Sequence, residues 1–157
     1  MKPTTKFIAI LILLIITYNT QASEVVTFKI SDGIENDYIK QKIEKTISNI
    51  LTEANIAHKA KRELNYAALN IPESVQGSLA ALWDNSPFVS FDTEIVEKCL
   101  TTSSGYQVRN IPLILMPFNP SDISEGEDYQ EAVISFDKQG NLTSFYLSIS
   151  MNLYMNV

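Results

Sequence analysis

The chain has 157 residues, of which 45% are hydrophobic, and its formal net charge is −6 at pH 7. A chain of this size forms one ordinary domain, and its acidic balance excludes the electrostatic footprint of a nucleic-acid-binding protein. A single cysteine, Cys99, excludes an internal disulfide, so packing has to supply the stability.

The first 22 residues have the pattern of a secretory signal peptide. Lys2 and Lys6 precede an unbroken apolar run at 7–16, and Thr20-Gln21-Ala22 follows, with small residues at the positions that a signal peptidase reads. The run is about half of the roughly 20 residues that span a bilayer, so an uncleaved N-terminal anchor is the weaker alternative. We predict a signal peptide over 1–22, a single domain over 23–157, and an exported protein, periplasmic or extracellular, without a stable membrane span after cleavage.

Residues 24–30 are rich in β-formers and are interpreted as a first strand or an extended lead-in. Isoleucine and alanine then recur at spacings of three and four, which predicts an amphipathic helix from about residue 36 to at least 54. Asp32 is the expected N-cap, with Glu35 at the third helical position. The spacing also allows this helix to continue, bent, through Leu64. Its solvated side is expected to carry the polar residues Lys40, Lys42, Glu44, Lys45 and Asn49.

Two shorter helices are predicted next. One begins near Pro72, at a position where the missing N–H costs nothing, and ends before Pro87. The other is capped at residues 92–94 and runs to about residue 100, with Cys99 on its apolar face.

Residues 106–116 are strongly β in character, although Pro112 cannot donate to a ladder. This strand therefore has to lie at an edge, carry a bulge, or break at the proline. The following stretch, 118–128, is an acidic loop whose residues do not follow the ligand order of a calcium loop, so we interpret it as solvated.

Residues 129–149 alternate between apolar and polar side chains, which predicts two strands joined by a tight turn at 137–141. Gly140 suits a turn position of positive φ. Residues 152–157 are predicted to form a last short strand or a docked tail. Helices followed by strands indicate an α+β fold, with a long N-terminal amphipathic helix and shorter helices packed on a curved, mainly antiparallel sheet.

Four segments carry a resemblance to a known family: ALWDNSPF (81–88), TEIVEKCL (93–100), GYQVRNIP (105–112) and YQEAVISFDKQG (129–140). They resemble a group of uncharacterised exported proteins of Bacteroidetes, over nearly the whole mature chain. Together with the order of elements, they are similar to the nuclear-transport-factor-2-like, cone-shaped α+β fold. The resemblance implies a fold and an envelope compartment but no mechanism, because the group has no established activity.

Aromatic and polar groups are concentrated between residues 82 and 112, a mixture that ligand pockets and interface hot spots use. An ordinary structural role is the competing interpretation, with the large aromatics in the core, a polar residue satisfying a helix end, and the arginine paired to a carboxylate. The candidate binding residues, for an interface or a pocket, are Trp83, Asp84, Asn85, Phe88, Tyr106, Arg109 and Asn110, with Gln107 beside them.

The sequence contains no recognisable catalytic motif. Nucleophilic catalysis needs a nucleophile beside a base, but the only histidine, His58, is predicted on a helix surface and the only thiol, Cys99, on an apolar face. One histidine and one cysteine cannot make a zinc tetrad, and the five glycines are too scattered for a phosphate-binding loop. We therefore predict no catalytic residues, no metal site and no cofactor, and we lean against an enzyme.

The favoured hypothesis is an exported, non-catalytic binding or assembly module of the bacterial cell envelope, whose partner is a protein or another envelope component. The rival is a small-molecule-binding pocket protein or small enzyme of the nuclear-transport-factor-2-like type, with Tyr106, Asp84 and Arg109 around a ligand. A homodimer through the open face of the sheet is the third alternative. A filled space between helix and sheet favours the first hypothesis, and a deep polar cavity favours the rival.

Overall fold

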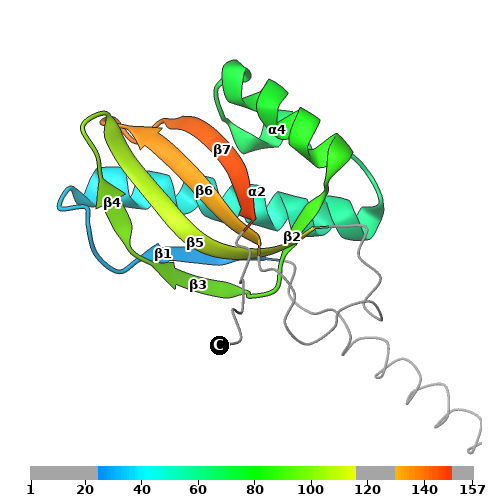
Figure 1. The fold of residues 1–157 in the computed structure, drawn as a ribbon, viewed down its shortest axis with the longest axis horizontal. Coiled ribbons are helices and arrows are strands. Elements are labelled where there is room, and N and C mark those ends of the chain that lie inside the picture. The colour runs from blue at the N-terminus through cyan, green and yellow to red at the C-terminus, as the bar shows by residue number, and fades with distance from the viewer. Residues whose placement is uncertain (1–24, 116–129, 150–157) are drawn as a thin grey trace, which may run out of the picture.

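The computed structural model describes residues 25–115 and 130–149, which fold as an α+β unit (Figure 1). A curled, mainly antiparallel sheet wraps around helix α2 (Asp37–Ala60), and a two-stranded parallel piece continues the curl. The predicted α+β class is confirmed. The predictions for the signal peptide at 1–22, the acidic loop at 118–128 and the tail at 152–157 lie outside the described residues.

Helix α2 coincides with the amphipathic helix predicted from residue 36, but its cap differs from the prediction. The side-chain oxygen of Asn36 accepts hydrogen bonds from the backbone N–H groups of Tyr38 at 3.0 Å and Ile39 at 3.2 Å. The predicted cap at Asp32 is wrong, and Glu35 precedes the helix. Asn36, four residues after Asp32, satisfies the free N–H groups of the first helical turn, and Asp32 lies in the turn before the helix.

The apolar face of α2 is buried along the whole helix, and the helix stops one turn before the longest prediction. Lys61 adopts a left-handed conformation (φ 52°), and its N–H bonds back to the helix, so the chain turns away at Ala60 and Leu64 is not helical. The buried residues of α2 are Ile43, Glu44, Ile47, Ile50, Leu51, Ala54 and Ala57.

Strand β1 (Thr27–Ile30) confirms the first predicted strand and lies with one edge against α2. It pairs in parallel with β3 (Glu94–Glu97), while its other edge donates to side chains of the helix. Four helical residues rise about 6 Å and two strand residues about 6.6 Å, so every fourth helical side chain meets every second strand N–H. The bonds, 2.8–2.9 Å long, run from the N–H groups of Val26, Phe28 and Ile30 to Thr52, Ser48 and Glu44 respectively.

Glu44 therefore corrects the sequence analysis, which placed it on the solvated side of the helix. Glu44 is 7% exposed, and its carboxylate accepts a hydrogen bond from the N–H of Ile30 at the edge of β1.

The predicted third helix over 93–100 is wrong, because these residues form β3 and β4 (Cys99–Thr101). Ile95 is buried between the exposed Glu94 and Val96, which is a period of two. Pairing of the backbone with β1 and with the long strand β5 (Gly105–Leu115) outweighs the local helix signal. Cys99 is still a buried small hydrophobe, 4% exposed.

The main sheet has the order β2 (Phe88–Ser90), β5, β6 (Gln130–Asp137) and β7 (Leu142–Ile149), with β4 also pairing β5. The predicted hairpin is confirmed as β6 and β7, and Gly140 in its turn has a φ of 74°. The predicted irregularity of β5 is also confirmed as a bulge between Val108 and Ile111. Pro112 lies next to this bulge, opposite Glu131 of β6.

Two further helices connect α2 to β2. The short α3 (Tyr66–Leu69) is followed by α4 (Glu73–Asn85), which is the second predicted helix, with Pro72 as its N-cap residue and Ser86 as its C-cap. Helix α4 lies over β7 at one end of the sheet, next to the last turns of α2 (Figure 1).

Candidate functional site

Two of the candidate residues, Trp83 and Phe88, belong to the core. Trp83 is 5% exposed and Phe88 is fully buried. Their rings meet edge to face, with centroids 5.5 Å apart, and Phe88 stacks in turn on Phe145 of β7 at 5.1 Å. These three rings fill the space between α4, β2 and β7, so the geometry favours the ordinary structural role for both candidates.

Asp84 and Asn85 end α4 and are exposed. The side-chain amide of Asn85 donates to the carbonyl oxygen of Ala81 at 2.6 Å, so this residue satisfies the helix end, as one interpretation of the sequence expected. Asp84 has no hydrogen bond or ion pair to another described residue and faces an open pocket.

Tyr106, Arg109 and Asn110 lie on β5. Tyr106 is partly buried opposite Phe136 of β6, whereas Arg109 and Asn110 are exposed at the bulge, where Asn110 has a φ of 65°. The guanidinium Nε of Arg109 donates to the side-chain oxygen of Gln107 at 2.6 Å. The expected carboxylate partner of Arg109 is therefore replaced, within the described residues, by an amide.

The structure does not bring Tyr106 and Asp84 together. Tyr106 pairs with Phe136 next to the hairpin turn, and Gly140 in that turn lies against Ile39 in the first turn of α2. Asp84 lies instead beside the last turn of α2. The 24 residues of α2 span about 36 Å, so these candidates occupy opposite ends of the molecule. The ligand site that the rival hypothesis requires, around Tyr106, Asp84 and Arg109, is not formed.

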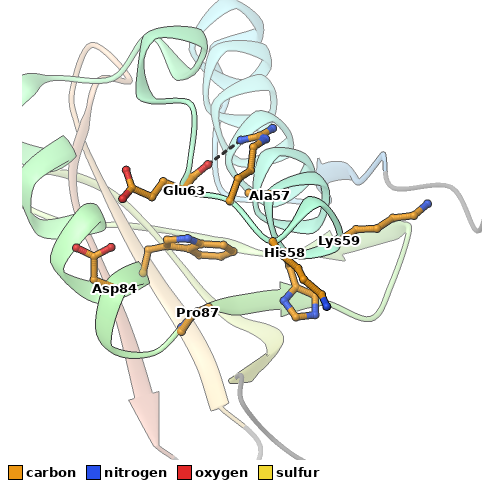
Figure 2. A pocket seen from close by; sticks show the side chains of 9 residues that line it. Ala57, His58, Lys59, Glu63, Asp84 and Pro87 are labelled. Carbon is orange, nitrogen blue, oxygen red and sulfur yellow. Dashed lines mark hydrogen bonds between the residues drawn. The ribbon is translucent and has the colours of Figure 1, made fainter.

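An open pocket of about 560 Å³ lies where the end of α2 meets the end of α4 (Figure 2). Figure 2 shows the carboxylates of Glu63 and Asp84 on one side of it and His58 and Lys59 on the other. The sequence analysis named two of its residues, Trp83 and Asp84, as candidates. The pocket is lined by Ala57, His58, Lys59, Lys61, Arg62, Glu63, Trp83, Asp84 and Pro87.

The chain that leaves α2 is held at the pocket by Glu53. Its carboxylate accepts two hydrogen bonds from the guanidinium of Arg62, at 2.6 and 3.3 Å, and one from the N–H of Asn65 at 2.6 Å. Burial by itself raises the pKa of Glu53, but the hydrogen bonds from Arg62 and Asn65 outweigh it and lower the pKa below its ordinary value. Arg62 is thereby committed to an internal pair.

Tyr66 is not among the residues that line the pocket, but it lies within reach of the charges of two that do. Burial raises the pKa of Tyr66, and the negative charges of Asp84 and Glu63 raise it further. The two carboxylates therefore act on the same phenol.

The thiol of Cys99 and the imidazole of His58 are not a catalytic pair. Cys99 lies against Gly33, ahead of the first turn of α2, whereas His58 lies in its last turn. Burial raises the pKa of the Cys99 thiol to about 11, so the nucleophilic thiolate is disfavoured.

Within residues 25–115 and 130–149, no group of three or more His, Cys, Asp or Glu residues is arranged to hold a metal ion. In the same part of the chain, no helix has both the length and the apolar character needed to cross a membrane. Comparisons of the chain with protein-family models, with curated proteins and with solved structures found no match. The site is therefore interpreted from its own residues.

Proposed function

We propose that the protein is an exported, non-catalytic binding module of the bacterial cell envelope that recognises a protein partner through the outer face of its sheet. The filled space between α4, β2 and β7 carries this proposal. Because Trp83, Phe88 and Phe145 occupy that space, it holds no deep ligand cavity, which supports recognition of a partner at the surface.

The inner face of the main sheet packs on α2, and the opposite face is uncovered by any described helix (Figure 1). Register places Gln107, Ser135 and Ser144 in one row across three strands of this face. Arg109 lies two residues beyond Gln107 on β5. Tyr146, which is 48% exposed, lies two residues beyond Ser144 on β7. Arginine and tyrosine are among the residue types that are enriched at interface hot spots. We call this set, Gln107, Arg109, Ser135, Ser144 and Tyr146, the outer-face patch.

Export is the second part of the proposal, and the basic start and apolar run of residues 1–16 support it. Membership of the exported Bacteroidetes group with a nuclear-transport-factor-2-like domain is likewise proposed. An α+β order and a curled sheet wrapped around a helix support that membership. The separation of Cys99 from His58 supports a role in binding rather than in nucleophilic catalysis.

The test compares two exposed tyrosines in a tagged protein expressed in an exporting bacterium. Tyr146→Ala removes an aromatic from the outer-face patch, whereas Tyr38→Ala removes one that is 75% exposed at the start of α2. We expect cross-linked partner recovery to fall about tenfold, the equivalent of 1.4 kcal/mol, for Tyr146→Ala and for Arg109→Ala, and to stay unchanged for Tyr38→Ala. Equal recovery in all variants would remove the outer-face patch from the proposal.

Two further readouts separate the parts of the proposal. N-terminal sequencing of the exported protein should find residue 23 first, and a full-length protein in the cytoplasm would overturn export. Light scattering of the purified protein should find a monomer; a dimer that Tyr146→Ala dissociates would make the partner a second copy of this chain.

A further inference from the structure

The acidic side of the pocket at the end of α2 carries two carboxylates that are unpaired within the described part of the chain. Glu63 and Asp84 make no ion pair with any described residue, although both line the same pocket. Figure 2 shows them on the same side, and both charges act on Tyr66. A pair of free carboxylates at one wall provides a place for a cationic group.

The opposite wall is basic. Figure 2 shows His58 and Lys59, which lie in the last turn of α2. Lys61, the C-cap residue of α2, also lines the pocket. The side chains of His58 and Lys61 have no hydrogen bond or ion pair with a described residue. Arg62 adds little, because Glu53 already holds its guanidinium. This wall provides a place for an anionic group, and among the described residues neither His58 nor Lys61 forms an ion pair with Glu63 or Asp84.

Trp83, which also lines the pocket, carries a buried donor that has no acceptor among the described residues. Trp83 is 95% buried, and its indole N–H makes no hydrogen bond with any described residue. Buried tryptophan N–H groups are usually hydrogen-bonded, so an oxygen atom of a ligand would satisfy this one. Ala57 and Pro87 add apolar surface to the lining of the pocket.

These features exclude most simple ligands. A purely cationic ligand would meet Lys61, and a purely anionic one would meet Glu63 and Asp84. A sugar that stacks on an aromatic face would find none here, because the ring of Trp83 is buried against Phe88. A ligand with separated positive and negative groups and an apolar body satisfies every wall of the pocket.

We propose that this pocket binds a short peptide whose two termini are both free. Its ammonium group lies beside Glu63 and Asp84, and its carboxylate lies beside the basic wall. A peptide oxygen accepts the indole N–H of Trp83, and an apolar side chain covers Ala57 and Pro87. The volume of about 560 Å³ lies within the roughly 300–1,000 Å³ of pockets that hold small ligands. This site is separate from the outer-face patch, and its failure would leave the proposed function standing.

The only tryptophan of the chain lines this pocket, so its fluorescence reports binding directly. The probe is the tripeptide Ala-Leu-Ala, titrated into the purified protein with free termini, with an acetylated N-terminus, and with an amidated C-terminus. We expect a saturable change with the free tripeptide, and at least about tenfold weaker binding after either terminus is blocked. The absence of a saturable change up to about 10 mM, or equal affinity for all three peptides, would overturn the proposal.

Variants assign each terminus to its wall. Asp84→Asn should weaken binding of the free tripeptide at least fivefold but leave the already weak binding of the acetylated tripeptide unchanged, because the partner of Asp84 is then absent. Lys61→Gln should likewise weaken binding of the free tripeptide but leave the already weak binding of the amidated tripeptide unchanged, because the partner of Lys61 is then absent. Asp92→Asn, at an exposed carboxylate outside the pocket, is the matched control and should change nothing. A variant that weakens the free and the blocked tripeptide equally would overturn the assignment of that terminus.

Discussion

The backbone N–H of Ile30 donates a hydrogen bond of 2.8 Å to the carboxylate Oε1 of Glu44, a helix side chain that is buried against the edge of β1. The other carboxylate oxygen lies 3.8 Å from Nζ of Lys29, whose side chain is largely in solvent. Ser48 and Thr52 continue the same series along α2. Helix side chains thus take the place of a neighbouring strand, and they cover an edge that would otherwise be open to pairing with another chain.

Loss of this contact should destabilise the fold. Glu44→Ala leaves the buried N–H of Ile30 without an acceptor, which costs about 1–3 kcal/mol of the free energy of unfolding. Urea denaturation followed by circular dichroism measures the change.

Glu44→Gln is the matched control, because glutamine keeps an oxygen at the same place and should retain most of the stability that alanine loses. Equal losses in the two variants would show that the hydrogen bond to Ile30 is not the cause.

The aromatic contacts of Phe88 give a second prediction. Phe88→Leu keeps most of the buried volume but removes the edge-to-face contact with Trp83 and the stacking on Phe145, for a cost of about 1–3 kcal/mol. The near-ultraviolet circular dichroism of Trp83 should change with it. Phe91→Leu, three residues later at a site that is 58% exposed, should change neither stability nor the spectrum. A similar loss at both sites would contradict the assignment of Phe88 to the core.

The regular spacing of hydrophobic residues and the positions of the prolines made part of the fold predictable from the sequence. The period of two over the hairpin and the period of three and four over α2 each report a single buried face. Pro72 and Pro87 bound α4 because each restricts the backbone whatever it packs against.

The errors arose where several local solutions were equally good. Asp32 and Asn36 are both suitable N-caps; Asn36 caps the helix, whereas the side chain of Asp32 accepts a hydrogen bond from the N–H of Gly33 in the preceding turn. Ile95 and Cys99 at a spacing of four fit a helix face as well as two strands, and pairing with β1 and β5 decides for strands. Glu44 is a charged residue of the kind expected at a solvated helix position, but the edge of β1 buries it.

The candidate site was predictable only in part, because nearness along the chain does not fix nearness in space. The aromatic and polar residues that the sequence groups between 82 and 112 divide between the core, the outer face of the sheet and the pocket. The sequence predicts His58 on a helix surface. It lines a pocket only because α4 ends beside it, and no sequence pattern records that contact.

The buried thiol predicts a loss of stability in alkali. Burial raises the pKa of Cys99 from its ordinary 9.0 to about 11. The thiol of the unfolded chain therefore deprotonates first, so its contribution to stability is complete below pH 9 and is lost between pH 9 and 11. Cys99→Ala removes the titrating group, so its free energy of unfolding should fall less steeply over this range than that of the wild type. Equal slopes from denaturation at pH 8, 9, 10 and 11 would contradict the expectation.

Two glycines provide the sharpest contrast in the chain. Gly33 has a φ of 103°, and a Cβ at this position would overlap the carbonyl oxygen of Cys99. Gly33→Ala combines backbone strain of about 1–3 kcal/mol with a clash against a backbone atom that cannot rotate away, so it should cost at least about 2 kcal/mol.

Gly77 lies on the exposed side of α4, and a Cβ there meets nothing within 4 Å. Gly77→Ala should therefore stabilise the protein by about 0.5–1 kcal/mol, because alanine loses less backbone entropy than glycine in a helix. Thermal unfolding of the two variants should move the midpoint in opposite directions. A midpoint unchanged by Gly33→Ala would show that β4 does not approach the turn before α2 as closely as the structure has it.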